Sequence, residues 1–350
     1  MQDSGQAWLV RGRRILLLVS AAYTVLLVGG LLTIQWVGER HWLPGTLLYV
    51  LPSYWLLPLV VLTPLSLARC PKACWWHLGA VIFATVGFMQ LRWTFPRKPN
   101  GSSYTLVTNN TGQRSQESLL GLIRKVQPDF VALQDSAREQ GAAVGAALGG
   151  RHVAQQNEFV LVSRFPIRSS GLVEGLSYGN LPLAAWFEVD CGGRSLVIYN
   201  LHLPTPRKEF YALRGHGFLP GLVLGGGVYS SSVRQAYRES LAQRVALAEE
   251  LAHRLAAENR PFVVVGDLNA PSQGYVRRLF SSKLTDLFAA TGRGYGLTFP
   301  GVTRNPLSLF GPWLRLDYIF AGTDVRALEC WVEPREPAKH RAVVGRFEID

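Results

Sequence analysis

The sequence predicts an α/β domain of mixed sheets packed face to face with flanking helices, preceded by three transmembrane helices. Three observations predict this arrangement. Three long runs without Asp, Glu, Lys or Arg occupy most of the first 94 residues. From residue 104 onwards, short apolar segments alternate with segments of helical periodicity. The formal net charge of +12 divides into +7 for residues 1–98 and +5 for residues 99–350, so the two parts differ in character.

Residues 1–94 are predicted to form a membrane anchor. The three uncharged runs cover residues 15–38, 43–68 and 73–91. Because an α-helix rises 1.5 Å per residue, about 20 residues cross a hydrocarbon core of ~30 Å. A cleaved signal peptide is the alternative interpretation of the first run. That run is too long for one, it lacks a small-residue cleavage site, and two further runs follow it.

The basic residues around these runs predict the orientation of the anchor. The sequence RGRR at residues 11–14 precedes the first run and favours a cytoplasmic N-terminus. Three crossings would then place the remainder outside the cytoplasm, as a multi-pass protein of the cell membrane. Residues 95–103 (FPRKPNGSS) are predicted to be the linker, and residues 104–350 the folded domain.

Within residues 104–350, two helices and several strands are predicted. The helices cover residues 115–126 and 231–259, where apolar positions repeat at intervals of three and four. Gly192 and Gly193 favour a hairpin turn between two of the strands. The predicted strands lie in residues 104–110, 128–136, 158–167, 184–190, 194–204, 262–272, 314–322, 325–333 and 341–349.

Polar residues collect at the ends of these strands. Turn chemistry accounts for each of them alone, but burying so many unpaired would be costly. Carboxylates, amides and histidines together suit metal-assisted attack on a phosphorus ester, because a hard cation prefers oxygen ligands and imidazoles stabilise phosphoryl charge. The residues concerned are Asn109, Asn110, Gln134, Asp135, Asn200, His202, Asp267, Asn269 and Asp317, with His340 just before the last strand.

Seven short motifs follow one another between residues 104 and 349: TNN, QPDFVALQD, LVSRFPI, NLHLP, VVVGDLNAPS, LTFP and RLDYIF. In this order they resemble the endonuclease/exonuclease/phosphatase superfamily, which has the deoxyribonuclease-I-like fold. Membrane-anchored bacterial members of that superfamily look similar in layout. The resemblance implies a four-layer α/β sandwich and a hydrolase of phosphoric esters. Known activities include nucleic-acid cleavage, sphingomyelin hydrolysis and inositol-phosphate dephosphorylation, normally with Mg²⁺ or a similar cation such as Mn²⁺ or Ca²⁺.

The resemblance also implies roles for individual residues. Asn110 and Asp135 would hold the metal ion, and His202 would stabilise the phosphate or protonate the leaving group. Asp267 and Asn269 match the Asp-x-Asn pair of the superfamily. They would position water or metal and donate to a phosphoryl oxygen, respectively.

The last pair implied by the resemblance is Asp317 and His340, in which the aspartate orients the histidine that serves as base. Two positions depart from the superfamily pattern. Lys339 replaces an aspartate beside the metal, and Asp135 replaces a glutamate. Lys339 would contact phosphate as a point charge, or point to solvent. A catalytically degenerate site that binds phosphate without turnover is therefore an open alternative.

Two apolar loops favour a lipid-linked phosphate or pyrophosphate as substrate. Residues 210–232 are glycine-rich and apolar, and alternatively fold over the core of the domain. Residues 305–314 are a second apolar loop that would form the other wall of the site. Arg207, Lys208 and Arg214 beside the first loop would receive anionic headgroups, whereas His216 is expected to be incidental. A nuclease acting on external DNA or RNA is the alternative enzyme, although a charge of +5 does not specify a nucleic-acid groove.

Overall fold

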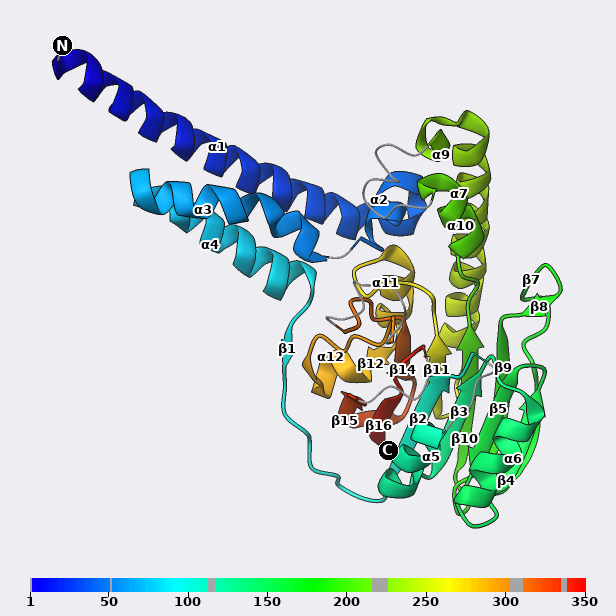
Figure 1. The fold of residues 1–350 in the computed structure, drawn as a ribbon. Helices are drawn as coiled ribbons and strands as arrows, with labels where there is room; N and C mark the ends of the chain where they lie inside the picture. The colour runs from blue at the N-terminus through cyan, green and yellow to red at the C-terminus, as the bar shows by residue number, and fades with distance from the viewer. Residues whose placement is uncertain (1, 51, 113–116, 216–225, 302–310, 335–338) are drawn as a thin grey trace.

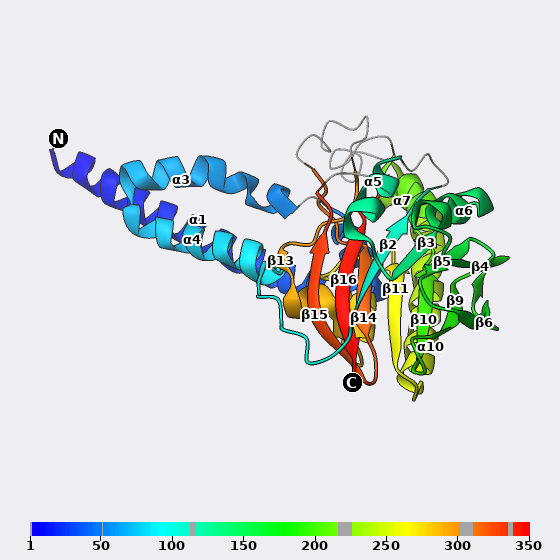
Figure 2. The same ribbon diagram turned by 90° about the horizontal axis from the view of Figure 1, so that it is seen from below.

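The computed structural model describes residues 2–50, 52–112, 117–215, 226–301, 311–334 and 339–350. Two six-stranded mixed sheets pack face to face, with helices on the outer faces (Figures 1 and 2). The first sheet has the order β15-β16-β2-β3-β5-β4, and the second has the order β12-β14-β11-β10-β9-β6. This arrangement confirms the predicted sandwich.

Nine strands of the two six-stranded sheets overlap predicted segments, whereas those over residues 152–156, 167–172 and 285–286 were not predicted. In the first sheet the strands are β2 (Ser103–Asn110), β3 (Phe130–Gln134), β4 (His152–Gln156), β5 (Phe159–Ser163), β15 (Val325–Val332) and β16 (Val343–Ile349). In the second they are β6 (Ile167–Leu172), β9 (Ala184–Asp190), β10 (Ser195–His202), β11 (Phe262–Asp267), β12 (Thr285–Asp286) and β14 (Asp317–Ala321). A small hairpin joins β7 (Ser177–Tyr178) to β8 (Leu181–Pro182).

Alternation along the strands creates three apolar layers, because successive side chains point to opposite faces of a sheet. Leu106 and Ile198 belong to the core between the sheets, together with Phe130 and Phe187. The outward residues pack under helices α5 (Glu117–Val126) and α6 (Arg138–Ala147) on the first sheet. On the second sheet they pack under α10 (Ser231–Ala256) and α11 (Tyr275–Ser281). The remaining helices among the described residues of this part are α7 (Arg207–Arg214), α9 (Gly226–Tyr229) and α12 (Leu287–Thr291).

The N-terminal part consists of α1 (Gln2–Val37), α2 (Trp42–Leu47), α3 (Leu57–Arg69) and α4 (Cys74–Ile82), which continues as a π-helix over Phe83–Phe88. Short 3₁₀ segments cover Gly38–Arg40, Pro52–Leu56 and Pro71–Ala73. Helices α1, α3 and α4 lie side by side and project away from the sandwich, with the N-terminus at the far end (Figures 1 and 2).

The expectation of three membrane-spanning helices is not met. Among the described residues, one helix, Val10–Arg40, is long and apolar enough to cross a membrane by length and composition. The second predicted span is broken into α2, a 3₁₀ segment and α3, and α3 has only 13 residues, or about 20 Å of rise. Prolines cause the breaks, because they lack an N–H donor and favour helix starts: Pro52 begins the 3₁₀ segment and Pro58 stands in the first turn of α3.

Residues 92–100 lie along the sandwich. β1 (Arg92–Trp93) pairs with β13 (Arg293–Gly294), and the N–H of Arg97 donates to the carbonyl of Leu328 at 2.7 Å. The N–H of Asn100 donates to a carboxylate oxygen of Glu348 at 2.8 Å. Much of the predicted linker is therefore attached to the sheets, and the predicted domain boundaries stay a prediction.

Candidate active site

Four strands bring their polar ends to one edge of the sandwich. β2 is parallel to β3 and β10 is parallel to β11, so the carboxyl ends of each pair meet. In the second sheet His202 lies opposite Asp267, and Asp267 lies opposite Asp317 at the start of the antiparallel strand β14. Asn110 lies opposite Gln134 in the first sheet. Because the two sheets face each other, the polar residues at the strand ends of one sheet lie close to those of the other.

The Asp267 carboxylate is the centre of this cluster. It is 1% exposed and accepts a hydrogen bond from Nδ2 of Asn110 at 2.9 Å. Nε2 of His202 lies 3.9 Å from its Oδ2 atom, and Nε2 of His340 lies 3.8 Å from the same oxygen. Gly266 allows this placement, because a Cβ atom there would lie 2.0 Å from the carbonyl oxygen of Leu201. Two imidazoles from different elements thus flank one buried carboxylate.

His340 is paired with Asp317. Its Nδ1 atom lies 2.9 Å from Oδ2 of Asp317, and both residues are buried. Burial by itself lowers the pKa of His340, but the charges of Asp317 and Asp267 outweigh burial and raise this pKa to about 9. The two carboxylates therefore favour the charged imidazolium form of His340. The Asn109 side chain fixes its position by donating to the His340 carbonyl at 3.1 Å.

His202 has a partner that the sequence analysis did not single out. Its Nδ1 atom lies 2.7 Å from a carboxylate oxygen of Glu158. Burial lowers the pKa of His202, whereas the Glu158 hydrogen bond and the charges of Asp267 and Asp135 raise it, with a net upward shift. Glu158 immediately precedes β5, which runs antiparallel to β3. In the sequence, Glu158 could be recognised only as a carboxylate before a buried strand. It reaches the site because that strand pairs antiparallel with β3.

Asn269 belongs to the loop after β11 and has a left-handed backbone with φ of +47°. Its N–H donates to Oδ1 of Asp267 at 2.8 Å, and its side-chain amide donates to the Leu203 carbonyl at 2.8 Å. One amide hydrogen is thereby used, and the other is available to a ligand.

Asp135 follows β3 with φ of +48°, and its charge reaches His202. Below the cluster, Gln134 donates to the Asn200 side chain at 2.6 Å, and Asn200 donates to the Leu133 carbonyl at 2.9 Å. These amides link the two sheets under the site. The sequence analysis grouped them with the catalytic candidates, and the structure gives them this bridging contact.

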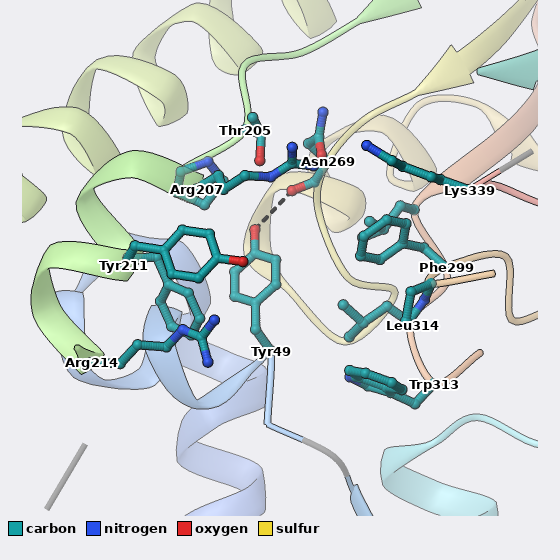
Figure 3. Close-up of a pocket in the computed structure, with 14 residues that line it drawn as sticks. Tyr49, Thr205, Arg207, Tyr211, Arg214, Asn269, Phe299, Trp313, Leu314 and Lys339 are labelled. Carbon is teal, nitrogen blue, oxygen red and sulfur yellow. Dashed lines mark hydrogen bonds between the residues drawn. The ribbon is translucent and has the colours of Figure 1, made fainter. Parts of the chain in front are cut away.

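A pocket of about 350 Å³ adjoins the cluster (Figure 3). Its walls are largely apolar and include five aromatic side chains, and Asn269 connects it to the cluster. The Phe299 ring lies 4.7 Å from the His340 ring, centroid to centroid. The aromatic lining residues are Tyr49, Phe210, Tyr211, Phe299 and Trp313.

Three of the four predicted substrate-binding cations line this pocket: Arg207, Arg214 and Lys339. Figure 3 shows Arg207 and Lys339 on either side of Asn269. Lys208 is exposed on α7 and is not among the described lining residues, so its role in substrate binding stays a prediction. His216, and parts of both predicted apolar loops (216–225 and 305–310), lie outside the described residues.

The donor atoms of the site suit a hard cation. Ligand atoms of Asp267, Asp317 and His340 lie within 4.8 Å of one another, and all three residues are buried. The hydrogen bond between His340 and Asp317 explains why these two residues lie together without a cation. Asn110 and Asp135 supply oxygen atoms at the ends of β2 and β3, and oxygen donors are what Mg²⁺, Mn²⁺ and Ca²⁺ prefer.

Comparison with protein families matches residues 100–339 to the Endonuclease/Exonuclease/phosphatase family. Comparison with curated proteins found no match. Among solved structures, a humanized D. rerio TDP2 has a TM-score of 0.50 at 13% identity, covering 71% of this chain and 100% of that chain.

Two further similar structures are a 3' phosphatase, NExo, from Neisseria bound to product DNA hairpin and a mannosyl-6-phosphatase from Bacteroides thetaiotaomicron. The first has a TM-score of 0.47 at 16% identity, covering 71% of this chain and 99% of that chain. The second has a TM-score of 0.44 at 15% identity, covering 70% and 100%. At such identities a structural likeness reports the fold alone.

Proposed function

Since the chain belongs to the Endonuclease/Exonuclease/phosphatase family, we propose that it is a membrane-anchored, divalent-metal-dependent phosphoric ester hydrolase. We propose that its substrate is a lipid-linked phosphate or pyrophosphate. The observation that carries the substrate class is the pocket beside the cluster. It combines aromatic walls with the cations Arg207, Arg214 and Lys339, and it opens onto Asn269. An ester whose phosphate is attached to an apolar group matches that combination.

Helix α1 supports the membrane location. Only 22% of its most apolar 18-residue window is buried inside the structure, so α1 is not a core helix of the sandwich. Large apolar side chains point outward along it, including Leu18, Leu26 and Trp36, which are 68%, 75% and 76% exposed. With RGRR at residues 11–14 on the cytoplasmic side, a single crossing by α1 would put the sandwich outside the cytoplasm.

The described residues suggest how hydrolysis would proceed. The imidazole groups of His340 and His202 bind the anionic phosphate, assisted by the second amide hydrogen of Asn269. The Asp267 carboxylate, between the two imidazoles, accepts the proton of the attacking water. His202 donates its Nε2 proton to the leaving oxygen. The raised pKa of His340 favours this phosphate-binding role over the role of base that the sequence pattern implied.

A divalent cation, when bound, would neutralise phosphoryl charge and polarise the ester. Asn110 and Asp135 are the residues that would hold it. Asp135 lies near enough to affect the charge state of His202. Asn110 also keeps Asp267 in place through its 2.9 Å hydrogen bond.

A substrate panel tests the proposal. The full-length protein in detergent would be offered a prenyl pyrophosphate, bis(4-nitrophenyl) phosphate and plasmid DNA, each with Mg²⁺ or Mn²⁺ and with a chelator. We expect metal-dependent hydrolysis of the prenyl pyrophosphate at the highest kcat/KM. Cleavage of DNA alone would establish an anchored nuclease instead. Phosphate binding by the folded protein without turnover of any substrate would establish a non-catalytic binding protein.

A further inference from the structure

The junction between the N-terminal helices and the sandwich is a fixed, buried contact. Glu39 follows α1 and is 1% exposed. Its carboxylate accepts hydrogen bonds from the backbone N–H groups of Tyr275 at 2.6 Å and Val276 at 3.3 Å. Gly274 makes room for it, because a Cβ atom at that position would lie 2.2 Å from Oε1 of Glu39. The anchor thus contributes a buried side chain to the N-terminal end of α11.

A side chain of the sandwich also contacts the anchor. The Arg278 guanidinium of α11 donates to the carbonyl of Trp36 at 2.8 Å and also to that of Gln35, at the C-terminal end of α1. A cation is favourable there, because the carbonyls at a helix C-terminus carry partial negative charge. Arg40 lies 4.4 Å above the Tyr275 ring. Residues 38–50 are therefore packed against the sandwich.

This segment reaches the candidate active site through Tyr49. The Tyr49 hydroxyl donates to the carbonyl oxygen of Asn269 at 2.8 Å (Figure 3). The same carbonyl accepts a hydrogen bond from the buried guanidinium of Arg244 at 3.0 Å, and Nε of Arg244 donates to the Pro204 carbonyl at 2.6 Å. The loops after β10 and β11 are consequently linked to each other and to the anchor.

The backbone of Asn269 needs such restraint. A left-handed φ costs free energy in a residue with a Cβ atom, and it persists where the surroundings hold it. Here the N–H, the side-chain amide and the carbonyl of Asn269 are all hydrogen-bonded, and the carbonyl bond from Tyr49 comes from 220 residues away in sequence.

We propose that Tyr49 is a positioning residue of the active site: its hydroxyl sets the orientation of Asn269, and its ring forms the anchor-side wall of the substrate pocket. Only the consequence for turnover rests on the proposed function; the positioning itself does not. The Tyr49 ring packs against Phe210 at 5.8 Å between centroids, and both rings line the pocket. The membrane anchor then contributes to catalysis and to substrate choice as well as to location.

The hydroxyl is tested by Tyr49→Phe in the full-length protein, with Tyr178→Phe as the matched control. Tyr178 also makes one hydroxyl hydrogen bond, to Ser240 at 3.3 Å, but lies outside the pocket and the cluster. We expect Tyr49→Phe to speed amide hydrogen exchange in residues 266–273 by about tenfold, as for loss of one hydrogen bond. With bis(4-nitrophenyl) phosphate and Mn²⁺, kcat should fall by about tenfold with KM unchanged. The control should change neither quantity.

The ring is tested by Tyr49→Ala with two substrates. Relative to Tyr49→Phe, this variant should raise KM for a prenyl pyrophosphate while leaving KM for bis(4-nitrophenyl) phosphate unchanged. Wild-type exchange and kinetics in Tyr49→Phe would overturn the positioning role, and equal KM changes for both substrates would overturn the pocket wall. If the wild-type protein hydrolyses neither substrate, the proposed function fails. Hydrogen exchange and prenyl pyrophosphate affinity, measured by calorimetry, then decide on the hydroxyl and the ring.

Discussion

The Nδ1 atom of His340 and the Oδ2 atom of Asp317 form a hydrogen bond of 2.9 Å that is closed off from solvent. Because the pKa of His340 is about 9, above its ordinary value of 6.5, this pair stabilises the fold through the charged imidazole. The contribution is fully present below about pH 6.5 and is lost as the pH rises through about 9.

The first prediction concerns Asp317→Asn in the metal-free protein. Removing the carboxylate charge should lower the pKa of His340 below 9, since burial then opposes the charged form with only Asp267 to favour it. An NMR titration of the imidazole measures this shift. The variant should also lose the decline in stability of the wild type between pH 6.5 and 9. An unchanged His340 pKa would show that Asp317 does not control its charge.

Glu158→Gln should make His202 a less effective proton donor. The 2.7 Å contact raises the pKa of His202, and the neutral amide removes the negative charge that favours the proton. We expect kcat to fall about tenfold and the alkaline limb of the pH–rate profile to move to lower pH, because the acid form of His202 is needed. Glu188→Gln is the control, since Glu188 contacts Ser169 and Ser195 at the surface. A profile that keeps its alkaline limb would contradict the role of Glu158.

The sequence predicted Asp267 as a site residue but did not single out Glu158, and this difference has a structural cause. Asp267 and His202 stand at the ends of two parallel strands, and such ends meet at one edge whatever the order of the sheet. Glu158 stands at the start of its strand, so it reaches the same edge only because β5 is antiparallel to β3. Strand polarity of that kind is not encoded in the local pattern.

Two other differences between expectation and structure are also geometric. Uniform hydropathy across residues 43–68 predicted one span, but Pro52 and Pro58 start separate helical segments there. Arg207 and Lys208 are neighbours in sequence, yet consecutive residues on a helix point about 100° apart. Arg214 is two turns from Arg207 and so returns to the pocket side. Tyr49 could not be predicted, because its partner is distant in the chain.

The cations of the pocket give a matched pair of variants. Lys339→Met removes a charge that lines the pocket, whereas Lys208→Met removes the same charge from the exposed face of α7. We expect Lys339→Met to raise KM for a prenyl pyrophosphate by about tenfold at low salt, and Lys208→Met to leave KM within about twofold. Mn²⁺ affinity, measured by calorimetry, should stay unchanged in both. A tightened Mn²⁺ affinity in Lys339→Met would place the ammonium beside the cation instead.

The location of the sandwich is tested by topology reporters fused after Asp350. With a single crossing by α1 and a cytoplasmic RGRR sequence, a reporter that matures only outside the cytoplasm should be active, and a cytoplasmic reporter should be inactive. Replacing Arg11, Arg13 and Arg14 by Asn should reduce this bias, because positive charges next to a span favour the cytoplasmic side. Activity of the cytoplasmic reporter alone would place the sandwich in the cytoplasm.

Asp286 contributes to the stability of the sandwich and not to catalysis. Its carboxylate contacts Arg277 at 2.7 Å and Arg315 at 2.6 Å, and all three side chains are at least nine-tenths buried. Burial raises the pKa of Asp286, but the two guanidinium groups outweigh burial and hold the pKa below its ordinary value of 3.8. Its contribution to stability is therefore present above that pH and is lost as the pH falls further.

Asp286→Asn should consequently lower the free energy of unfolding by about 3 kcal/mol, because two buried cations lose their counter-ion. Asparagine still caps α12, whose Ala289 N–H donates to Oδ1 of Asp286 at 3.0 Å, so the loss reports the charge and not the cap. Glu250→Gln, in an exposed pair with Arg254, should change stability by less than about 0.5 kcal/mol. Denaturant titration in detergent measures both variants. A loss for Asp286→Asn as small as that of the control would mean that water or another anion compensates the two arginines.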